Sequence, residues 1–306
     1  MSFFVNLYKK NVIMRFDKDP AIPYFSAEDF NDLKCEHNAF KNSRDLEIHY
    51  FYYYYDGYRD DEVILFLPGM GPGHTAYLSE IQYLCKKGFK ILTLDYTGCG
   101  LSQGETILST NEPTRDVVDL LNYLKLSQEV VLVGHSLGAY TTVNVAHIRG
   151  DITKAVIISG FLNLQDELKR TFKSALIAKS IMKFERSVEP DYCDLGNYAY
   201  LKETKDNLLF IHSKDDKRVK YSHTIPVLKK INNPNIKIIE VNNKKHNPTY
   251  TEKAVAYLDF VAKGYMKLLK KKADLKERKK FMKDKSIYKM TELDRSIMNA
   301  IVDFIS

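Results

Sequence analysis

The stretch of sequence that decides the fold is Val130–Tyr140, VVLVGHSLGAY. An apolar run typical of a buried strand leads into Gly-His-Ser-Leu-Gly, and a helical pattern follows at once. A strand-to-helix turn this tight leaves no room for a β-carbon on either side of Ser136, which explains the two flanking glycines. Such a turn strains the serine backbone and exposes its hydroxyl, so Ser136 is the candidate nucleophile. A plain glycine-rich turn is the alternative interpretation.

The sequence around this turn alternates short apolar runs with segments of helical period from about residue 60 onward. This alternation is typical of a parallel sheet that is covered by helices on both faces. The runs expected as strands are Val63–Leu67, Ile91–Leu94, Val130–Val133, Ala155–Ile158, Leu208–Ile211 and Ile236–Val241. The segments expected as helices are about 74–87, 114–126, 136–148 and 222–232. We therefore predict an α/β fold with a mostly parallel, doubly wound sheet.

A further strand is predicted ahead of this unit, over Asp45–Tyr55, which is rich in aromatic residues and ends at the turn signal Asp56-Gly57. We expect it to add an antiparallel edge to the sheet. Its four consecutive tyrosines, 52–55, would suit a stacking surface for nucleic acid. Interleaved arginines are missing, however, and an alternating strand with one buried face explains the tyrosines better.

The chain is expected to form a single catalytic domain over 1–306, with two additions. Residues 161–206 make an unusually long connection, with a helical stretch near Gln165–Phe184 and then a loop rich in Pro, Asp, Gly and Asn. We interpret this insertion as a small helical lid over the catalytic face. The C-terminal segment 250–306 is mostly helical in pattern, and its last helix should dock on the sheet.

That last helix is expected to begin at a capping box formed by Thr291 and Asp294. An apolar stripe follows, made by Leu293, Ile297, Ile301 and Phe304.

The formal net charge of +7 is concentrated in one segment. Residues 267–285 hold ten Lys/Arg against three Asp/Glu, a surplus of seven that equals the surplus of the whole chain. The bland interpretation is a solvated lysine-rich helical face, and contact with an anionic membrane surface or nucleic acid is the alternative. We expect no nucleic-acid partner, and the sequence leaves the oligomeric state undetermined.

Composition and motifs exclude several other classes of protein. The chain is 44% hydrophobic and 28% charged, as in ordinary globular proteins, and we expect neither a secretory leader nor a membrane span. Cysteines 35, 85, 99 and 193 lack metal-ligand spacing, so we expect reduced thiols in a cytoplasmic protein. Gly69–Gly73 lacks the Lys-Ser/Thr of a phosphate loop, and no dinucleotide fingerprint occurs. No metal or cofactor is therefore expected.

From Val63 to His246 the sequence resembles the α/β-hydrolase superfamily, nearest to its esterase, lysophospholipase-like and aminopeptidase-like members. The resemblance rests on the Gly-His-Ser-Leu-Gly turn in its strand-to-helix setting and on Asp95–Ser102, DYTGCGLS, which is similar to the family's D-x-x-G-x-G-x-S turn. It implies a catalytic triad in the order Ser, Asp or Glu, then His. We expect the Asp95–Ser102 turn to be structural, and Cys99 within it not to be a reactive thiol.

The resemblance points to His246 as the base, because VNNKKHNP follows the last strand and is similar to the family's histidine loop. A serine hydroxyl needs a neutral imidazole to remove its proton, and that imidazole needs a carboxylate on its other nitrogen. His74 and His223 stay open as alternatives. For the acid, the family spacing after the strand Leu208–Ile211 falls on Asp216, and a one-residue shift would select Asp215 instead.

The oxyanion of a tetrahedral intermediate needs two preorganised donors. By resemblance, the first is the backbone N–H of Leu137, directly after the nucleophile. The second is expected at Met70 in the loop Pro68–Gly73, which is similar to the family's His-Gly-x-Gly loop with Pro68 in place of the histidine.

These residues predict a serine hydrolase that cleaves carboxylic esters of a small molecule through an acyl-enzyme on Ser136. Ester, thioester and amide substrates all suit a Ser–His–Asp arrangement, so aminopeptidase-like, lysophospholipase-like and thioesterase activities remain alternatives. A non-catalytic α/β-hydrolase-fold module that binds a ligand is the alternative from another class.

Overall fold

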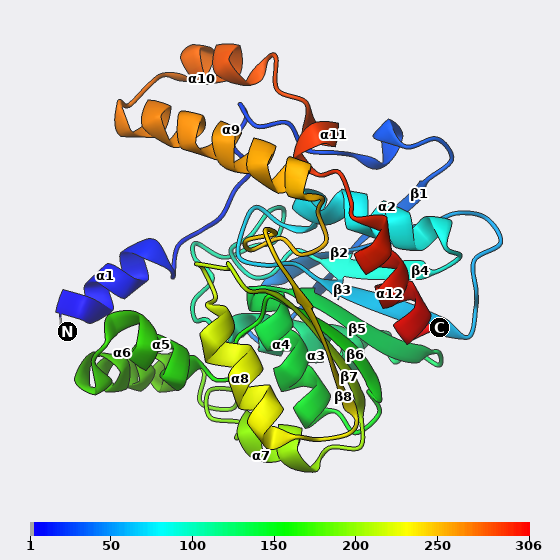
Figure 1. Cartoon of the computed structure of the whole chain (residues 1–306), viewed down its shortest axis with the longest axis vertical. Coiled ribbons are helices and arrows are strands. Elements are labelled where there is room, and N and C mark those ends of the chain that lie inside the picture. The colour runs from blue at the N-terminus through cyan, green and yellow to red at the C-terminus, as the bar shows by residue number, and fades with distance from the viewer. Residues whose placement is uncertain (1–2) are drawn as a thin grey trace.

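The computed structural model describes residues 3–306, and its centre is one sheet with the strand order β1-β2-β4-β3-β5-β6-β7-β8 (Figure 1). The pairs β1–β2 and β2–β4 are antiparallel, and every other neighbouring pair is parallel. The strands are β1 Lys34–Lys41, β2 Glu47–Tyr54, β3 Glu62–Leu67, β4 Lys90–Leu94, β5 Glu129–His135, β6 Lys154–Ile158, β7 Asn207–Ser213 and β8 Ile236–Val241.

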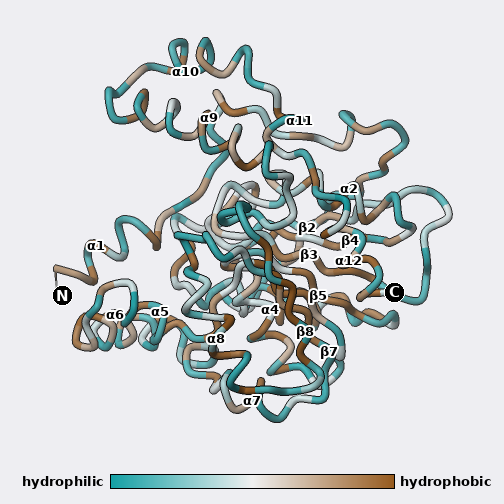
Figure 2. The backbone as a smooth tube through the Cα atoms, in the orientation of Figure 1, coloured by the Kyte–Doolittle hydropathy of each residue, from teal (hydrophilic) through white to brown (hydrophobic). Residues whose placement is uncertain are grey.

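Helices cover both faces of this sheet. One face carries α3 (Glu112–Leu124), α4 (Leu137–Ile148) and α8 (Tyr221–Ile231), and the other carries α2 (Leu78–Lys86) and α12 (Arg295–Ile305). Successive strand residues point to opposite faces of the sheet. Leu65 therefore packs into the core under α3, α4 and α8, while Ile64 and Phe66 pack into the core under α2 and α12. Figure 2 shows the result, with the most hydrophobic backbone in the central strands.

The predicted α/β-hydrolase architecture is confirmed, because each of the six predicted parallel strands and four helices coincides with an observed element to within a few residues. The expected helix over 74–87 begins with a short 3-10 turn at His74–Tyr77.

The expected edge position of the Asp45–Tyr55 strand is wrong. The edge is β1, whose side chains are almost all exposed, while β2 lies between β1 and β4. An interior strand has both faces covered, which is why Tyr50 packs into one core and Phe51 and Tyr53 into the other. The sequence of β1 does not predict a strand, because Phe40 is its only buried side chain and no alternation of apolar and polar residues results.

The long connection 161–206 contains three helices, α5 Leu164–Phe172, α6 Ala175–Val188 and α7 Asn197–Glu203. The single helical stretch expected near Gln165–Phe184 is broken in two at Lys173, which adopts a left-handed conformation, and Ser174 caps the second helix. The N-terminal helix α1, Phe3–Asn11, packs beside α6, where Tyr8 donates a 2.6 Å hydrogen bond to the buried Glu185 (Figure 1).

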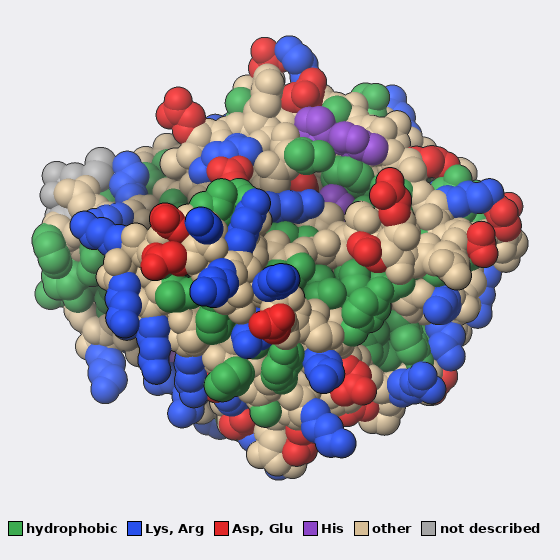
Figure 3. Space-filling model, turned by 90° about the horizontal axis from the view of Figure 1, so that it is seen from above, with side chains coloured by type: hydrophobic (Ala, Val, Ile, Leu, Met, Phe, Trp, Pro, Cys, Tyr) green, Lys and Arg blue, Asp and Glu red, His purple; other side chains and the backbone are tan. Residues whose placement is uncertain are grey.

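The C-terminal segment forms α9 Glu252–Lys270, α10 Leu275–Met282, α11 Ile287–Met290 and α12. The first two make an arm that projects from the body, and Lys and Arg side chains are dense on the surface of this end of the molecule (Figures 1 and 3). The expected capping box is wrong: Asp294 itself is the N-cap of α12 and accepts from the backbone N–H groups of Ser296 and Ile297. None of the helices in residues 3–306 is long and apolar enough to cross a membrane.

Candidate active site

Ser136 lies at the end of β5 and directly before α4, in a backbone conformation with φ +57° and ψ −114°. A positive φ is unfavourable for a residue with a β-carbon and persists only where the surroundings enforce it. Here Gly134 and Gly138 let the neighbouring backbone pack closely enough to hold Ser136 in this conformation. A β-carbon on Gly138 would lie 2.0 Å from the carbonyl oxygen of Leu67, and one on Gly134 would lie 2.3 Å from the carbonyl oxygen of Gly138. Only glycine fits at either position.

His246 joins Ser136 and Asp216, which come from separate parts of the sheet's carboxyl edge. Its Nε2 lies 2.8 Å from Ser136 Oγ, and its Nδ1 lies 2.7 Å from Asp216 Oδ2. Asp216 follows β7 and His246 follows the neighbouring strand β8, which brings their two loops together, and the histidine loop reaches past β7 and β6 to Ser136 at the end of β5. The arrangement allows the serine proton to pass to an imidazole that a carboxylate orients.

Asp216 is fully enclosed yet ionised. Burial alone would raise the pKa of its carboxyl, but hydrogen bonds from His212 and His246 outweigh burial and lower the pKa to about 2. Its Oδ1 also accepts the backbone N–H groups of Arg218 and Val219, at 2.8 and 3.2 Å. Because these donors stabilise the charged form, Asp216 carries a full negative charge at neutral pH.

The alternative acid makes other contacts. Asp215 Oδ1 accepts from the Ser213 hydroxyl at 2.6 Å and from the backbone N–H of Lys245, so it braces the histidine loop and does not touch the imidazole.

The alternative bases are engaged elsewhere. His74 is buried between Asp95, at 2.8 Å, and the Tyr53 hydroxyl, at 2.9 Å. His223 is paired with Glu167 at 2.9 Å. Neither histidine contacts Ser136 among the interactions of residues 3–306.

The Asp95–Ser102 turn is tied together by its first residue. Asp95 accepts from the backbone N–H of Leu101, and its carbonyl accepts from the Ser102 hydroxyl. Burial raises the pKa of the Cys99 thiol well above its usual range, which disfavours the reactive thiolate.

A chain of hydrogen bonds that the sequence did not reveal links the two loops around Ser136. His135 Nε2 lies 2.7 Å from the carbonyl oxygen of His246, and its Nδ1 lies 2.9 Å from the Tyr77 hydroxyl, which accepts the backbone N–H of Gly69. Burial, with help from the charge of His246, lowers the pKa of His135 to about 3, so its ring is neutral. Nε2 must then carry the proton toward the carbonyl, and Nδ1 accepts from Tyr77.

The two expected oxyanion donors flank the serine. Leu137 is the first residue of α4, where backbone N–H groups have no partner within the helix, and Met70 follows Gly69 at the rim of the cavity around Ser136. Within residues 3–306, neither backbone N–H donates a recorded hydrogen bond to another protein group. Both are therefore available to a ligand.

The cavity at Ser136 has a volume of about 260 Å³ and is walled partly by α9. Its lining combines the site residues with apolar and charged side chains: Gly69, Met70, Tyr77, His135, Ser136, Arg218, Lys245, His246, Asn247, Val255, Leu258, Asp259 and Ala262. None of the lining residues comes from 161–206. The interpretation of that insertion as a lid stays a prediction.

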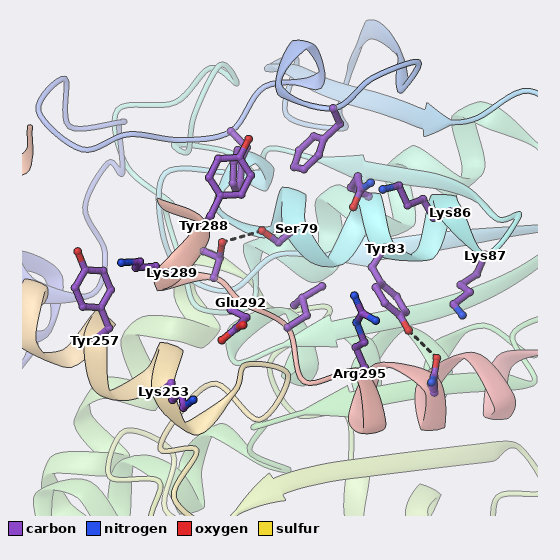
Figure 4. Close-up of a pocket in the computed structure, with 16 residues that line it drawn as sticks. Ser79, Tyr83, Lys86, Lys87, Lys253, Tyr257, Tyr288, Lys289, Glu292 and Arg295 are labelled. Carbon is purple, nitrogen blue, oxygen red and sulfur yellow. Dashed lines mark hydrogen bonds between the residues drawn. The ribbon is translucent and has the colours of Figure 1, made fainter. Parts of the chain in front are cut away.

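A larger cavity, of about 1110 Å³, lies between α2, α11 and α12 (Figure 4). Basic side chains, including Lys86, Lys289 and Arg295, reach it from several elements, and Tyr288 and Tyr257 add aromatic surface. It contains no histidine and no serine paired with a base, so the chemistry of acyl transfer has no support there. In the described chain, no group of three or more His, Cys, Asp or Glu side chains could hold a metal ion.

Comparisons with known proteins agree with this architecture. The esterase Pf2001 of Pyrococcus furiosus superposes with a TM-score of 0.59 at 16% identity, covering 88% of this chain and 98% of that one. The acylaminoacyl peptidase of Pyrococcus horikoshii superposes with a TM-score of 0.55 at 20% identity, covering 72% of this chain and 38% of that one. Both likenesses concern the fold.

Two curated relatives match by sequence over a shorter stretch. The putative chloroplastic methylesterase 14 of Arabidopsis thaliana is 30% identical over 93 residues, and the pheophorbidase of Raphanus sativus is 32% identical over 87 residues. The matched stretches cover 29% and 27% of this chain, and 27% and 33% of the two relatives. The chain thus matches about a third or less of each.

The chain has the α/β-hydrolase fold. The family model described as serine aminopeptidase, S33, matches residues 59–194, a stretch that includes Ser136 and Leu137 but ends before Asp216 and His246.

Proposed function

We propose that the protein is a serine hydrolase that cleaves carboxylic ester bonds through an acyl-enzyme on Ser136. The observation that carries the proposal is the continuous hydrogen-bonded line from Ser136 through His246 to an ionised Asp216. A ligand-binding module of the same fold would have no use for a buried carboxylate that orients an imidazole onto a strained serine.

The coarser assignment, a hydrolase of the α/β-hydrolase superfamily, is supported by the family model and by relatives and structural neighbours that are named as esterases or peptidases. The finer assignment to esters follows the esterase names among them. The serine aminopeptidase description and the acylaminoacyl peptidase favour amide cleavage as the second candidate.

The first half of the proposed reaction acylates the serine. Ser136 Oγ attacks the ester carbonyl carbon while its proton moves to His246 Nε2, giving a tetrahedral intermediate. His246 then returns the proton to the leaving alcohol as the C–O bond breaks. Asp216 stabilises the imidazolium that forms between the two steps and holds the ring with Nε2 toward the serine.

The second half releases the acid. Water gives a proton to His246 Nε2 and attacks the acyl carbon, and the protonated imidazole returns the proton to Ser136 as the acyl–oxygen bond breaks. In both halves the negative oxygen faces the backbone N–H groups of Leu137 and Met70, and loss of one such donor typically costs roughly 10²- to 10³-fold in rate.

The test is labelling and turnover at Ser136. A fluorophosphonate probe should form an adduct on Ser136 of the folded protein, and p-nitrophenyl esters of short acids should be hydrolysed faster than aminoacyl p-nitroanilides. Ser136→Ala should abolish labelling and lower ester turnover by roughly 10⁶-fold, to the level that the remaining groups provide. Full activity in that variant would refute the mechanism, and preferred cleavage of the anilides would select the peptidase.

A further inference from the structure

The cavity at Ser136 holds a positive charge that the proposed chemistry does not use. Arg218 lines the cavity together with Ser136 and His246. Its side chain is exposed to solvent, and its charge also adds to the lowering of the pKa of His135, after burial and the charge of His246. An arginine keeps this charge at every pH that an enzyme of this kind meets.

The Arg218 side chain has no partner in the part of the chain that the structure describes. Its backbone N–H holds Asp216, but among the interactions of residues 3–306 its guanidinium enters no hydrogen bond, ion pair or ring contact. The charge of Asp216 is already stabilised by hydrogen bonds from two backbone N–H groups and from His246 and His212. Ionised side chains beside a catalytic cavity that lack a partner are available to a substrate.

The other charged side chains of the cavity are paired with one another, so Arg218 carries its unpaired charge. Lys245 is paired with Asp259 at 2.9 Å, and the same carboxylate also pairs with Lys263 at 2.6 Å. Among the described residues that line the cavity, Asp259 is the only carboxylate, and two lysines hold it. An incoming anion therefore meets an unpaired guanidinium and a shared carboxylate whose charge is already compensated.

The remaining wall sets the size and character of the acyl group. Val255, Leu258 and Ala262 from α9, together with Met70 from the loop Pro68–Gly73, give apolar contact surface. A cavity of about 260 Å³ lies just below the roughly 300–1,000 Å³ of pockets that take drug-sized ligands, so it suits a short chain.

We propose that Arg218 is a specificity residue, and that the preferred substrate is an ester with a short apolar chain and a negatively charged group, typically a carboxylate, that pairs with Arg218. This inference rests on the proposed function. A guanidinium matches a carboxylate with two parallel hydrogen bonds, which gives both attraction and orientation.

The experiment compares matched neutral and anionic esters. The acyl arm pairs p-nitrophenyl butyrate with the p-nitrophenyl monoesters of succinic, glutaric and adipic acids. The leaving-group arm pairs phenyl butyrate with 4-carboxyphenyl butyrate. For each pair, kcat/KM is measured with the unaltered protein, Arg218→Gln, Arg218→Lys and the neighbouring Lys217→Gln. The Ser136→Ala protein measures the background, including self-hydrolysis of the anionic esters.

We expect the unaltered protein to favour the anionic partner in one arm, which shows on which side of the ester the charge is held. Arg218→Gln should lower that preference ratio by roughly tenfold or more, because a hydrogen bond to a charged group contributes about 1.5–3 kcal/mol. Arg218→Lys should retain part of the ratio, and Lys217→Gln should leave it unchanged, since Lys217 does not line the cavity.

The inference would be overturned, with the proposed function left intact, by hydrolysis of neutral esters with no anionic preference in either arm or by a preference that Arg218→Gln does not reduce. An equal loss in Lys217→Gln would also overturn it, because general surface charge would then be the cause. Absence of hydrolysis of all these esters would instead contradict the proposed function.

Discussion

The Asp216 carboxylate accepts every hydrogen bond it makes, and this dictates which tautomer His246 adopts. The carboxylate takes a proton-bearing Nδ1 at 2.7 Å, so Nε2 of the neutral ring carries a lone pair toward Ser136. The neighbouring Asp215 makes no such contact, although it lies one residue away.

Replacing Asp216 by Asn should therefore lower kcat for a p-nitrophenyl ester by roughly 10⁴-fold, because an amide can present an N–H to Nδ1 and favour the wrong tautomer. Steady-state kinetics of purified variants would measure the effect. Asp215→Asn is the matched control, and we expect a change of less than about tenfold. If Asp215→Asn caused the larger loss, the acid would have been assigned to the wrong residue.

At the scale of elements, the strand-to-helix turn depends on how closely α4 approaches β3. Gly138 lies in the first turn of α4, where its α-carbon faces the carbonyl oxygens of Leu67 and Pro68. In an ordinary helix, exchanging Gly for Ala stabilises by about 1 kcal/mol. Here the added methyl group would collide with backbone, which cannot move aside as a flexible side chain can.

We predict that Gly138→Ala destabilises the protein by about 1–3 kcal/mol or more, in spite of the better helix propensity of alanine. Urea unfolding followed by circular dichroism would measure the free energy of unfolding. Gly150→Ala is the control, because a β-carbon there meets nothing within 4 Å, and its effect should stay within about 0.5 kcal/mol. A neutral or stabilising Gly138→Ala would show that the turn relaxes easily.

The stability of the whole molecule should depend on a carboxyl that the proposed reaction does not use. Glu80 of α2 is buried, and its Oε1 accepts from the Thr249 hydroxyl. Burial raises its pKa to about 8, against about 4.3 for an exposed glutamate. The folded protein holds this proton at pH 7 and the unfolded chain does not.

The sign of the pH effect follows from this difference. The native state binds the extra proton between about pH 4.3 and 8, so the contribution of Glu80 to the free energy of unfolding falls by up to about 1.4 kcal/mol per pH unit as the pH rises through that interval. In the Glu80→Gln variant the side chain keeps its size and shape but can no longer ionise. The difference in unfolding free energy between Glu80→Gln and the unaltered protein should thus grow from pH 5.5 to 7.5 in favour of the variant. Parallel pH profiles would contradict the assignment.

The sequence by itself determined the parts of the protein that depend on local order. Apolar runs alternating with helical periods gave the parallel strands, because burial of both sheet faces leaves that mark on the residues. The two glycines around Ser136 indicated the turn because no other residue fits so close to neighbouring backbone. Resemblance then ranked His246 and Asp216, whose roles stay predictions.

Only the tertiary structure decided what depends on contacts between distant segments. The exposed strand β1 has no apolar pattern to reveal it, and the cap of α12 fell to Asp294, whose carboxylate is also paired with the buried Lys244. The hydrogen-bond chain through His135 and Tyr77, and the unpaired Arg218 beside Ser136, bring together loops far apart in sequence. The spacing of residues along the sequence does not predict such contacts, because the order of strands in the folded sheet determines which loops meet at its carboxyl edge.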